Sequence, residues 1–163
     1  MREYSDFALR GALDRFKRHL RITSDDLDAD LRGKLVAAIM SAEQMIGKVI
    51  LRSQFSVTVP FSRSIRLKGP ETEIVSVTID GQASEAWTLS GRTLSITGSG
   101  QSVSIVYEAG YTCPPEDIIA AIMLHGASLF ANVADSVETL TKASDNLLRP
   151  YRTYGLDEDG DGD

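Results

Sequence analysis

The stretch Val103-Ser-Ile-Val-Tyr-Glu-Ala-Gly-Tyr-Thr-Cys-Pro-Pro-Glu-Asp-Ile-Ile-Ala-Ala-Ile-Met-Leu124 decides the fold, because it joins a strand directly to a helix. Apolar residues recur at every second position from Val103 to Tyr107, the period of a strand with one buried face. Gly110 can take the positive φ that ends such a strand. Pro114-Pro115 then start a helix, whose first turn carries two acids that suit the helix dipole. A β-region therefore passes into a helix at this point.

Outward from this joint, the sequence predicts helices on both sides of a group of short strands. Helical spacing of apolar residues predicts helices at about 6–21, 25–52 and 115–140, the second begun by the capping cluster Thr23–Asp26. Between them the period changes to two, which predicts about six short antiparallel strands over 55–109. The expected fold is α+β: mainly a bundle of three principal helices with a small inserted antiparallel β-region. We expect one domain at 1–156, followed by an acidic disordered tail at 157–163.

Composition indicates a soluble globular protein with no marked excess of basic residues. The 163 residues include 17 Lys and Arg against 23 Asp and Glu, for a net charge of −6. Five of those acids lie in the last seven residues, so the remaining chain holds 17 basic and 18 acidic residues. This balance argues against a dedicated nucleic-acid-binding protein. No apolar run is long enough to span a membrane, and no signal peptide is apparent, so cytoplasmic synthesis is the simplest expectation.

The acidic tail gives the clearest candidate for a metal site. Asp157, Asp159, Asp161 and Gly162 match the first, third, fifth and sixth positions of an EF-hand calcium loop. The twelfth-position glutamate and the following helix are missing, so a disordered acidic terminus is favoured over a calcium site. No cofactor is expected.

The sequence contains no clear catalytic arrangement. Cys113 is the single cysteine, and His125 lies within an apolar helix. Cys113 reads best as a small turn residue, and His125 as a core or interface residue, so an enzyme is not expected.

The segment from Leu147 to Gly155 is richer in interface-type residues than a simple chain end requires. It places Arg149, Tyr151, Arg152 and Tyr154 around a proline, and arginine and tyrosine are enriched in binding hot spots. Two interpretations remain open: docking onto another chain, which is favoured, and a strap that lies against its own domain.

Three ordered stretches together resemble the gp6-like head–tail connector (adaptor) proteins of long-tailed double-stranded DNA bacteriophages. Phe16-Lys-Arg-His-Leu-Arg-Ile22, with the acids and long helix after it, resembles the opening of the family. Val103–Met123 resembles its strand–turn–helix joint, and Leu147-Leu-Arg-Pro-Tyr-Arg152 its C-terminal phrase. The acidic extension after Gly155 departs from the family pattern.

The resemblance implies a non-enzymatic structural subunit of a virion neck, assembled in the host cytoplasm. Such subunits form a ring, typically a dodecamer, that docks on the portal protein and extends the DNA channel. The ring then presents the attachment surface for the stopper or tail-completion protein, while DNA passes without sequence-specific contact. By analogy, the resemblance implies that the portal contacts are Arg149, Tyr151, Arg152 and Tyr154. No membrane partner is implied.

The alternative interpretation is a small soluble interaction module unrelated to virions, with the acidic tail as a weak calcium site. A less favoured alternative is an enzyme that uses Cys113 or His125.

Overall fold

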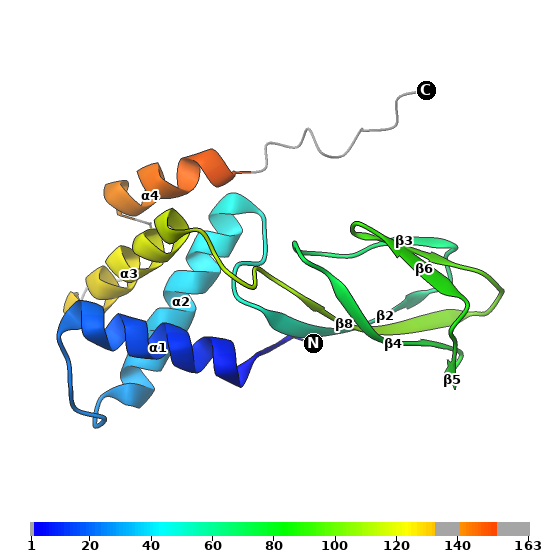
Figure 1. The fold of residues 1–163 in the computed structure, drawn as a ribbon, viewed down its shortest axis with the longest axis horizontal. Coiled ribbons are helices and arrows are strands. Elements are labelled where there is room, and N and C mark those ends of the chain that lie inside the picture. The colour runs from blue at the N-terminus through cyan, green and yellow to red at the C-terminus, as the bar shows by residue number, and fades with distance from the viewer. Residues whose placement is uncertain (1, 133–140, 153–163) are drawn as a thin grey trace. The chain divides into compact units, whose positions relative to one another are not determined.

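The computed structural model describes residues 2–132 and 141–152 and divides into two compact units (Figure 1). Met1–Ala8 and Val49–Thr112 form the first, here called the β-unit. Leu9–Lys48 and Cys113–Asp163 form the second, here called the helical unit. Within the described ranges, none of the helices combines the length and apolar character that a membrane crossing requires.

The larger sheet of the β-unit is antiparallel and has the strand order β1-β2-β8-β4-β5. Its strands are β1 (Arg2–Tyr4), β2 (Ser53–Pro60), β8 (Ser102–Ala109), β4 (Glu73–Ile79) and β5 (Gln82–Ala83). The central strand β8 pairs with β2 along its whole length and with β4 on its other edge. The strand that leads into the Gly110 turn therefore forms the middle of this sheet.

A second, three-stranded antiparallel sheet has the order β3-β7-β6. It consists of β3 (Ser64–Arg66), β7 (Thr93–Ile96) and β6 (Trp87–Ser90). Gly91 takes a φ of 57° in the tight turn between β6 and β7, a backbone conformation that favours glycine.

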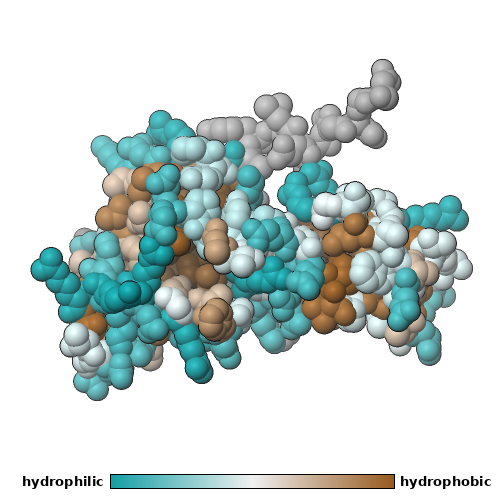
Figure 2. Space-filling model, viewed as in Figure 1, coloured by the Kyte–Doolittle hydropathy of each residue, from teal (hydrophilic) through white to brown (hydrophobic). Residues whose placement is uncertain are grey.

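Alternating apolar side chains from both sheets form the core of the β-unit. Strand β8 alternates cleanly between half-buried and buried residues, as predicted from its period of two. The buried cluster consists of residues from β4, β7 and β8 and of the residue that follows β3: Val77, Leu94, Ile96, Val103, Ile105, Tyr107, Ala109 and Leu67. Further apolar side chains pack on the cluster while staying partly exposed, and Figure 2 shows hydrophobic residues at the surface of this unit.

Gly110 ends β8 in a conformation that only glycine adopts without strain. Its φ is 124°, as the sequence predicted, and a Cβ there would lie 2.7 Å from the backbone N and Cα of Arg52. The chain can therefore turn against the start of β2 only because position 110 lacks a side chain. Pro115 then takes an extended conformation as the N-cap residue of the next helix, as expected from the proline pair.

The helical unit contains four described helices and one short 3₁₀ turn. They are α1 (Asp6–Leu20, begun within the β-unit stretch), α2 (Asp28–Ile46), α3 (Glu116–Ala131), α4 (Lys142–Leu148) and the 3₁₀ turn Arg149–Tyr151. Helix α3 packs against both α2 and α4. Gly126 of α3 faces Phe16 of α1, whose ring would lie 3.0 Å from an added Cβ. A larger residue at position 126 would displace this fully buried ring.

Two predicted helix boundaries differ from the structure. The second helix was predicted at 25–52, but α2 begins after Leu27 and ends at Ile46. Gly47 stops it early by adopting a left-handed φ of 71°, the usual C-terminal cap. The third helix was predicted at 115–140, whereas α3 ends at Ala131, and 133–140 lie outside the described residues.

The α+β class is confirmed, and the predicted arrangement of three principal helices with an inserted β-region is broadly compatible with the structure, but the β-region is larger than predicted. The β-region builds two sheets and a core of its own. It is also extended by β1, whose three residues carried no strand signal of their own. The single-domain limits of 1–156 stay a prediction, and the acidic tail at 157–163 lies outside the described residues.

Candidate functional site

The C-terminal segment that the sequence singled out is anchored on the helical unit. Thr141 caps α4 by accepting a hydrogen bond from the Ser144 backbone N–H. The buried Ser144 hydroxyl donates to the Ala121 carbonyl oxygen of α3 over 2.9 Å. Leu148, at the end of α4, is fully buried. This short helix therefore holds the following residues at a fixed place on its own unit.

Three of the four predicted contact residues make polar contacts within the helical unit. Arg149 and Arg152 both approach the Asp145 carboxylate, at 3.4 and 3.3 Å. The Tyr151 hydroxyl donates to Asp117, near the start of α3, over 3.4 Å. These contacts match the strap interpretation as far as position 152, and Tyr154 lies outside the described residues.

The same contacts leave the segment accessible to a partner. The Arg149 side chain is 62% exposed and that of Arg152 is 37% exposed. Ion pairs at this exposure contribute little to stability, so both guanidinium groups can exchange Asp145 for another acceptor. The role of these residues in binding a second chain therefore stays a prediction.

A second polar cluster joins α1 to the start of α2. The Lys17 ammonium, with its side chain only 11% exposed, donates to Asp25 over 2.5 Å and to Asp28 over 2.6 Å. The hydrogen bond from Lys17 holds the pKa of Asp25 below its usual range, and the same contacts raise the pKa of Lys17. These acids therefore serve to fix the loop between two helices.

In the β-unit, Arg52 joins three strands. Its guanidinium donates to Glu108 of β8 at 3.0 Å, to Glu73 of β4 at 2.7 Å and to the Glu71 carbonyl oxygen at 3.3 Å. No sequence motif indicated this cluster, because its members are up to 56 positions apart. In the predicted fold Arg52 is the last residue of the second helix, at 25–52, so nothing in the sequence indicated that it would contact two strands.

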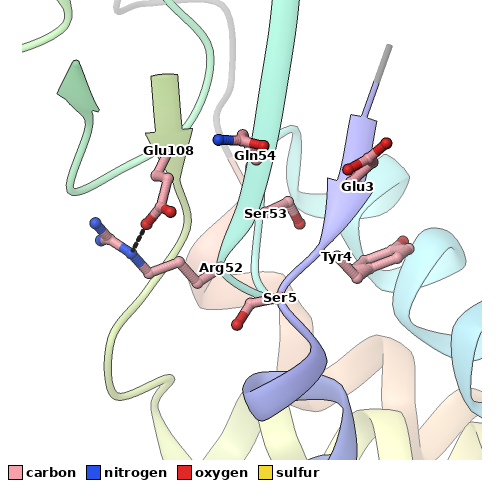
Figure 3. Close-up of a pocket in the computed structure, with 7 residues that line it drawn as sticks. All are labelled: Glu3, Tyr4, Ser5, Arg52, Ser53, Gln54 and Glu108. Carbon is pink, nitrogen blue, oxygen red and sulfur yellow. Dashed lines mark hydrogen bonds and ion pairs between the residues drawn. The ribbon is translucent and has the colours of Figure 1, made fainter. Parts of the chain in front are cut away.

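Figure 3 shows the pocket of about 180 Å³ that lies beside this cluster. Arg52 points toward Glu108 there, so its positive charge is already compensated. The lining includes neither histidine nor cysteine, and it consists of Glu3, Tyr4, Ser5, Arg52, Ser53, Gln54 and Glu108. This arrangement supports the strand ends and offers no pair of nucleophile and base.

Cys113 and His125 are not brought together. Cys113 is exposed ahead of α3, whereas His125 is 2% exposed and lies nine residues inside that helix. Nine residues correspond to roughly 14 Å along a helix axis, beyond the reach of a hydrogen bond. Burial lowers the pKa of His125, and its Nδ1 has no hydrogen-bond partner among the described residues. His125 is therefore a neutral core residue, as predicted, but an incompletely satisfied one.

Among the residues that the structure describes, no group of three or more His, Cys, Asp or Glu side chains could hold a metal ion. The calcium-loop positions Asp157, Asp159, Asp161 and Gly162 lie outside those residues.

Comparison with solved structures gives likenesses that span nearly the whole chain. One is a chain from the neck of an empty gene transfer agent (GTA) particle computed with C6 symmetry, at a TM-score of 0.70 and 19% identity. Another comes from the neck of the native GTA particle computed with C12 symmetry, at a TM-score of 0.68 and 20% identity. A third belongs to the virion of the native particle, at 0.68 and 19%. Each covers 94% of this chain and 96% of the other.

No protein-family model and no curated protein matches the chain. At these identities the structural likeness establishes a shared fold, which includes both the β-unit and the helical unit.

Proposed function

We propose that this chain is a structural subunit of the neck of a phage-like particle. The observation that supports this proposal is the agreement of fold over 94% of the chain with chains from GTA particle necks. Those necks were computed with C6 and C12 symmetry, which fits a subunit that works in a ring. In this proposal the ring is a dodecamer that docks on the portal protein, extends the DNA channel and carries the stopper or tail-completion protein.

The C-terminal segment is the proposed portal contact. Arg149, Tyr151, Arg152 and Tyr154 supply the residue types that interfaces use as anchors. The support from geometry is that α4 is fixed by Ser144 and Leu148, while Arg149 after it is exposed and Arg152 is partly exposed. A fixed base with exchangeable side-chain contacts suits a segment that binds a partner without refolding the whole unit.

Electron microscopy of the purified protein mixed with the portal protein of the same particle tests this proposal. We expect a ring seated on the portal, and loss of that ring when Arg149, Tyr151, Arg152 and Tyr154 are all changed to alanine. A matched control changes Arg10 and Arg18 on the exposed face of α1 to alanine, and it should still dock. Absence of docking by the unaltered protein would refute the proposed function. Docking by the quadruple variant would refute the assignment of the contact.

A further inference from the structure

The three-stranded sheet of the β-unit has one face in the core and one face open. Ile65, Leu94 and Leu89 pack toward the buried cluster from the three strands. Because side chains alternate along a strand, the residues between them lie on the opposite face. That outer face consists of a single arginine and five hydroxyl side chains, nearly all exposed: Ser64, Arg66, Thr88, Ser90, Thr93 and Ser95.

The chain segments that build this sheet are free of acidic residues. Residues 61–68 and 86–101 contain Arg63, Arg66, Lys68 and Arg92, and no Asp or Glu. In the sequence, the acidic residues of 71–85 lie between these two basic segments, so no basic run is apparent. Strand pairing excludes those acids from the three-stranded sheet and brings the two basic segments together. The result is a local charge of +4 in a chain whose net charge is −6.

Strand register places Arg66, Lys68 and Arg92 at one end of β3 and β7. Arg63 lies at the other end, where its carbonyl oxygen accepts a hydrogen bond from the Ile96 backbone N–H. Arg66 lies opposite Thr93, and the Leu67 backbone N–H donates to the Arg92 carbonyl oxygen over 2.8 Å. Neighbouring strands are about 4.8 Å apart, so Arg92 and Lys68 emerge close to Arg66. Among the described residues, no carboxylate forms an ion pair with Arg63, Lys68 or Arg92. In the same unit, by contrast, Arg52 is paired with two carboxylates.

We propose that this outer face, together with Arg63, Lys68 and Arg92 at the ends of its strands, binds the phosphate backbone of duplex DNA without reading its sequence. Arginine, lysine, serine and threonine are the side chains that contact phosphates and sugars. Single-stranded DNA is held through aromatic stacking, but Trp87 packs toward the core instead. Protein interfaces need an apolar centre, and this face has none, so phosphate is a better ligand than an acidic protein surface.

The inference deepens the proposed function, because a neck subunit would meet duplex DNA in its channel. Its support lies in the β-unit alone, whereas the proposed portal contact lies in the helical unit. DNA binding and portal binding can therefore fail independently of each other.

Fluorescence anisotropy with two labelled 30-base-pair duplexes of different sequence tests the proposal at several salt concentrations. Both duplexes should bind with equal affinity, and the logarithm of affinity should fall against the logarithm of salt with a slope of about −2 to −3 for the three cations Arg63, Lys68 and Arg92. The variant Arg63→Gln/Lys68→Gln/Arg92→Gln should bind at least about tenfold more weakly at 50 mM salt, with a slope shallower by about 2 to 3.

The matched control carries Arg10→Gln/Arg18→Gln/Arg21→Gln, which removes the same charge from exposed positions on α1 and just after it. It should keep most of the affinity of the unaltered protein. An equal or larger loss in this control would overturn the proposal, as would a lack of duplex binding by the unaltered protein. Tighter binding of polyglutamate or single-stranded DNA at equal salt would also overturn it. The sheet variant should still dock on the portal, which separates this test from that of the proposed function.

Discussion

The helical unit and the β-unit differ in where their acidic residues lie relative to their cations. In the helical unit, Lys17 is held by two aspartates, and Arg149 and Arg152 share Asp145. In the β-unit, Arg52 is paired with Glu73 and Glu108, whereas Arg63, Lys68 and Arg92 form no ion pair among the described residues and lie in segments without Asp or Glu. Charges that are neutralised within a unit hold its elements in place, whereas charges left open are available to a ligand. The difference lies in the sequence around each cation: acids are interspersed with the basic residues of α1, but they are absent from the segments that build the three-stranded sheet.

A single fluorescent residue allows the two units to be followed separately. Trp87 is the only tryptophan and lies in the β-unit, so its emission reports on that unit. The α-helical circular dichroism signal reports chiefly on the helical unit, which contains nearly all of the described helix. Unfolding of the two units can therefore be measured separately in one sample.

The largest effect is expected for Gly110→Ala in the β-unit. The new Cβ would meet the backbone of Arg52 at 2.7 Å, in a residue already held at a φ of 124°. Together these should cost roughly 3 kcal/mol or more of unfolding free energy, measured by Trp87 fluorescence in urea. Gly91→Ala is the control, because its Cβ meets nothing within 4 Å, and it should cost only about 1 to 2 kcal/mol. Equal losses in the two variants would contradict the close approach at position 110.

Arg52→Gln should have the next largest effect on the β-unit. It removes the ion pairs with Glu73 and Glu108 and leaves both carboxylates near the strand ends. We expect a loss of about 1 to 3 kcal/mol in unfolding free energy by the same fluorescence measurement. The comparison variant Arg63→Gln should change it by no more than about 0.5 kcal/mol. A similar loss in both variants would show that the ion pairs of Arg52 contribute no more to stability than the unpaired charge of Arg63.

Acidification should weaken the helical unit first. Burial holds the pKa of His125 below its ordinary value of 6.5, so the unfolded state binds more protons than the folded state below that pH. Stability is therefore complete above pH 6.5 and falls as the pH decreases below it, by up to about 1.4 kcal/mol per pH unit. The helical dichroism midpoint in urea should follow this trend between pH 7 and 5, while Trp87 fluorescence should not.

The variant His125→Leu provides the control for this pH dependence. It should flatten the response of the helical unit between pH 7 and 5. A slope that persists in this variant would assign the effect to another group.

Asp145→Asn should have the smallest effect on stability. It removes the shared carboxylate of Arg149 and Arg152, whose side chains are 62% and 37% exposed. Thermal unfolding followed by dichroism should show a loss of at most about 0.5 to 1 kcal/mol. By contrast, Ser144→Ala should cost about 1 to 3 kcal/mol, because it leaves the buried Ala121 carbonyl without this donor. If Asp145→Asn is the more damaging variant, the arginines belong to the fold rather than to a partner surface.

Local signals predicted the elements of this chain well. The alternation from Val103 to Tyr107, the positive φ of Gly110 and the proline-started helix all appear in the structure. These features depend on residues that are close together in the sequence. The early end of α2 could also have been predicted, since Gly47 is a typical helix C-cap.

Features that depend on distant pairing could not be predicted. Residues Arg2–Tyr4 form strand β1 only because they pair with the edge of β2, some 50 residues later in the sequence. The acid-free sheet has the same origin, because the charge balance of the whole chain hides two basic segments until strand register joins them. Of the predicted contact residues, Arg149, Tyr151 and Arg152 do lie together, but their acidic neighbours Asp145 and Asp117 were not foreseen.

Each unit is assembled from two separated pieces of chain, and this constrains folding during synthesis. Strand β2 is made early, yet its partner β8 ends at Ala109, so the larger sheet stays incomplete until that residue has left the ribosome. Helix α2 likewise cannot complete its packing until α3, which begins at Glu116, has been synthesised. Contacts of such long sequence separation slow folding, so both units should reach their native state only after most of the chain has been translated.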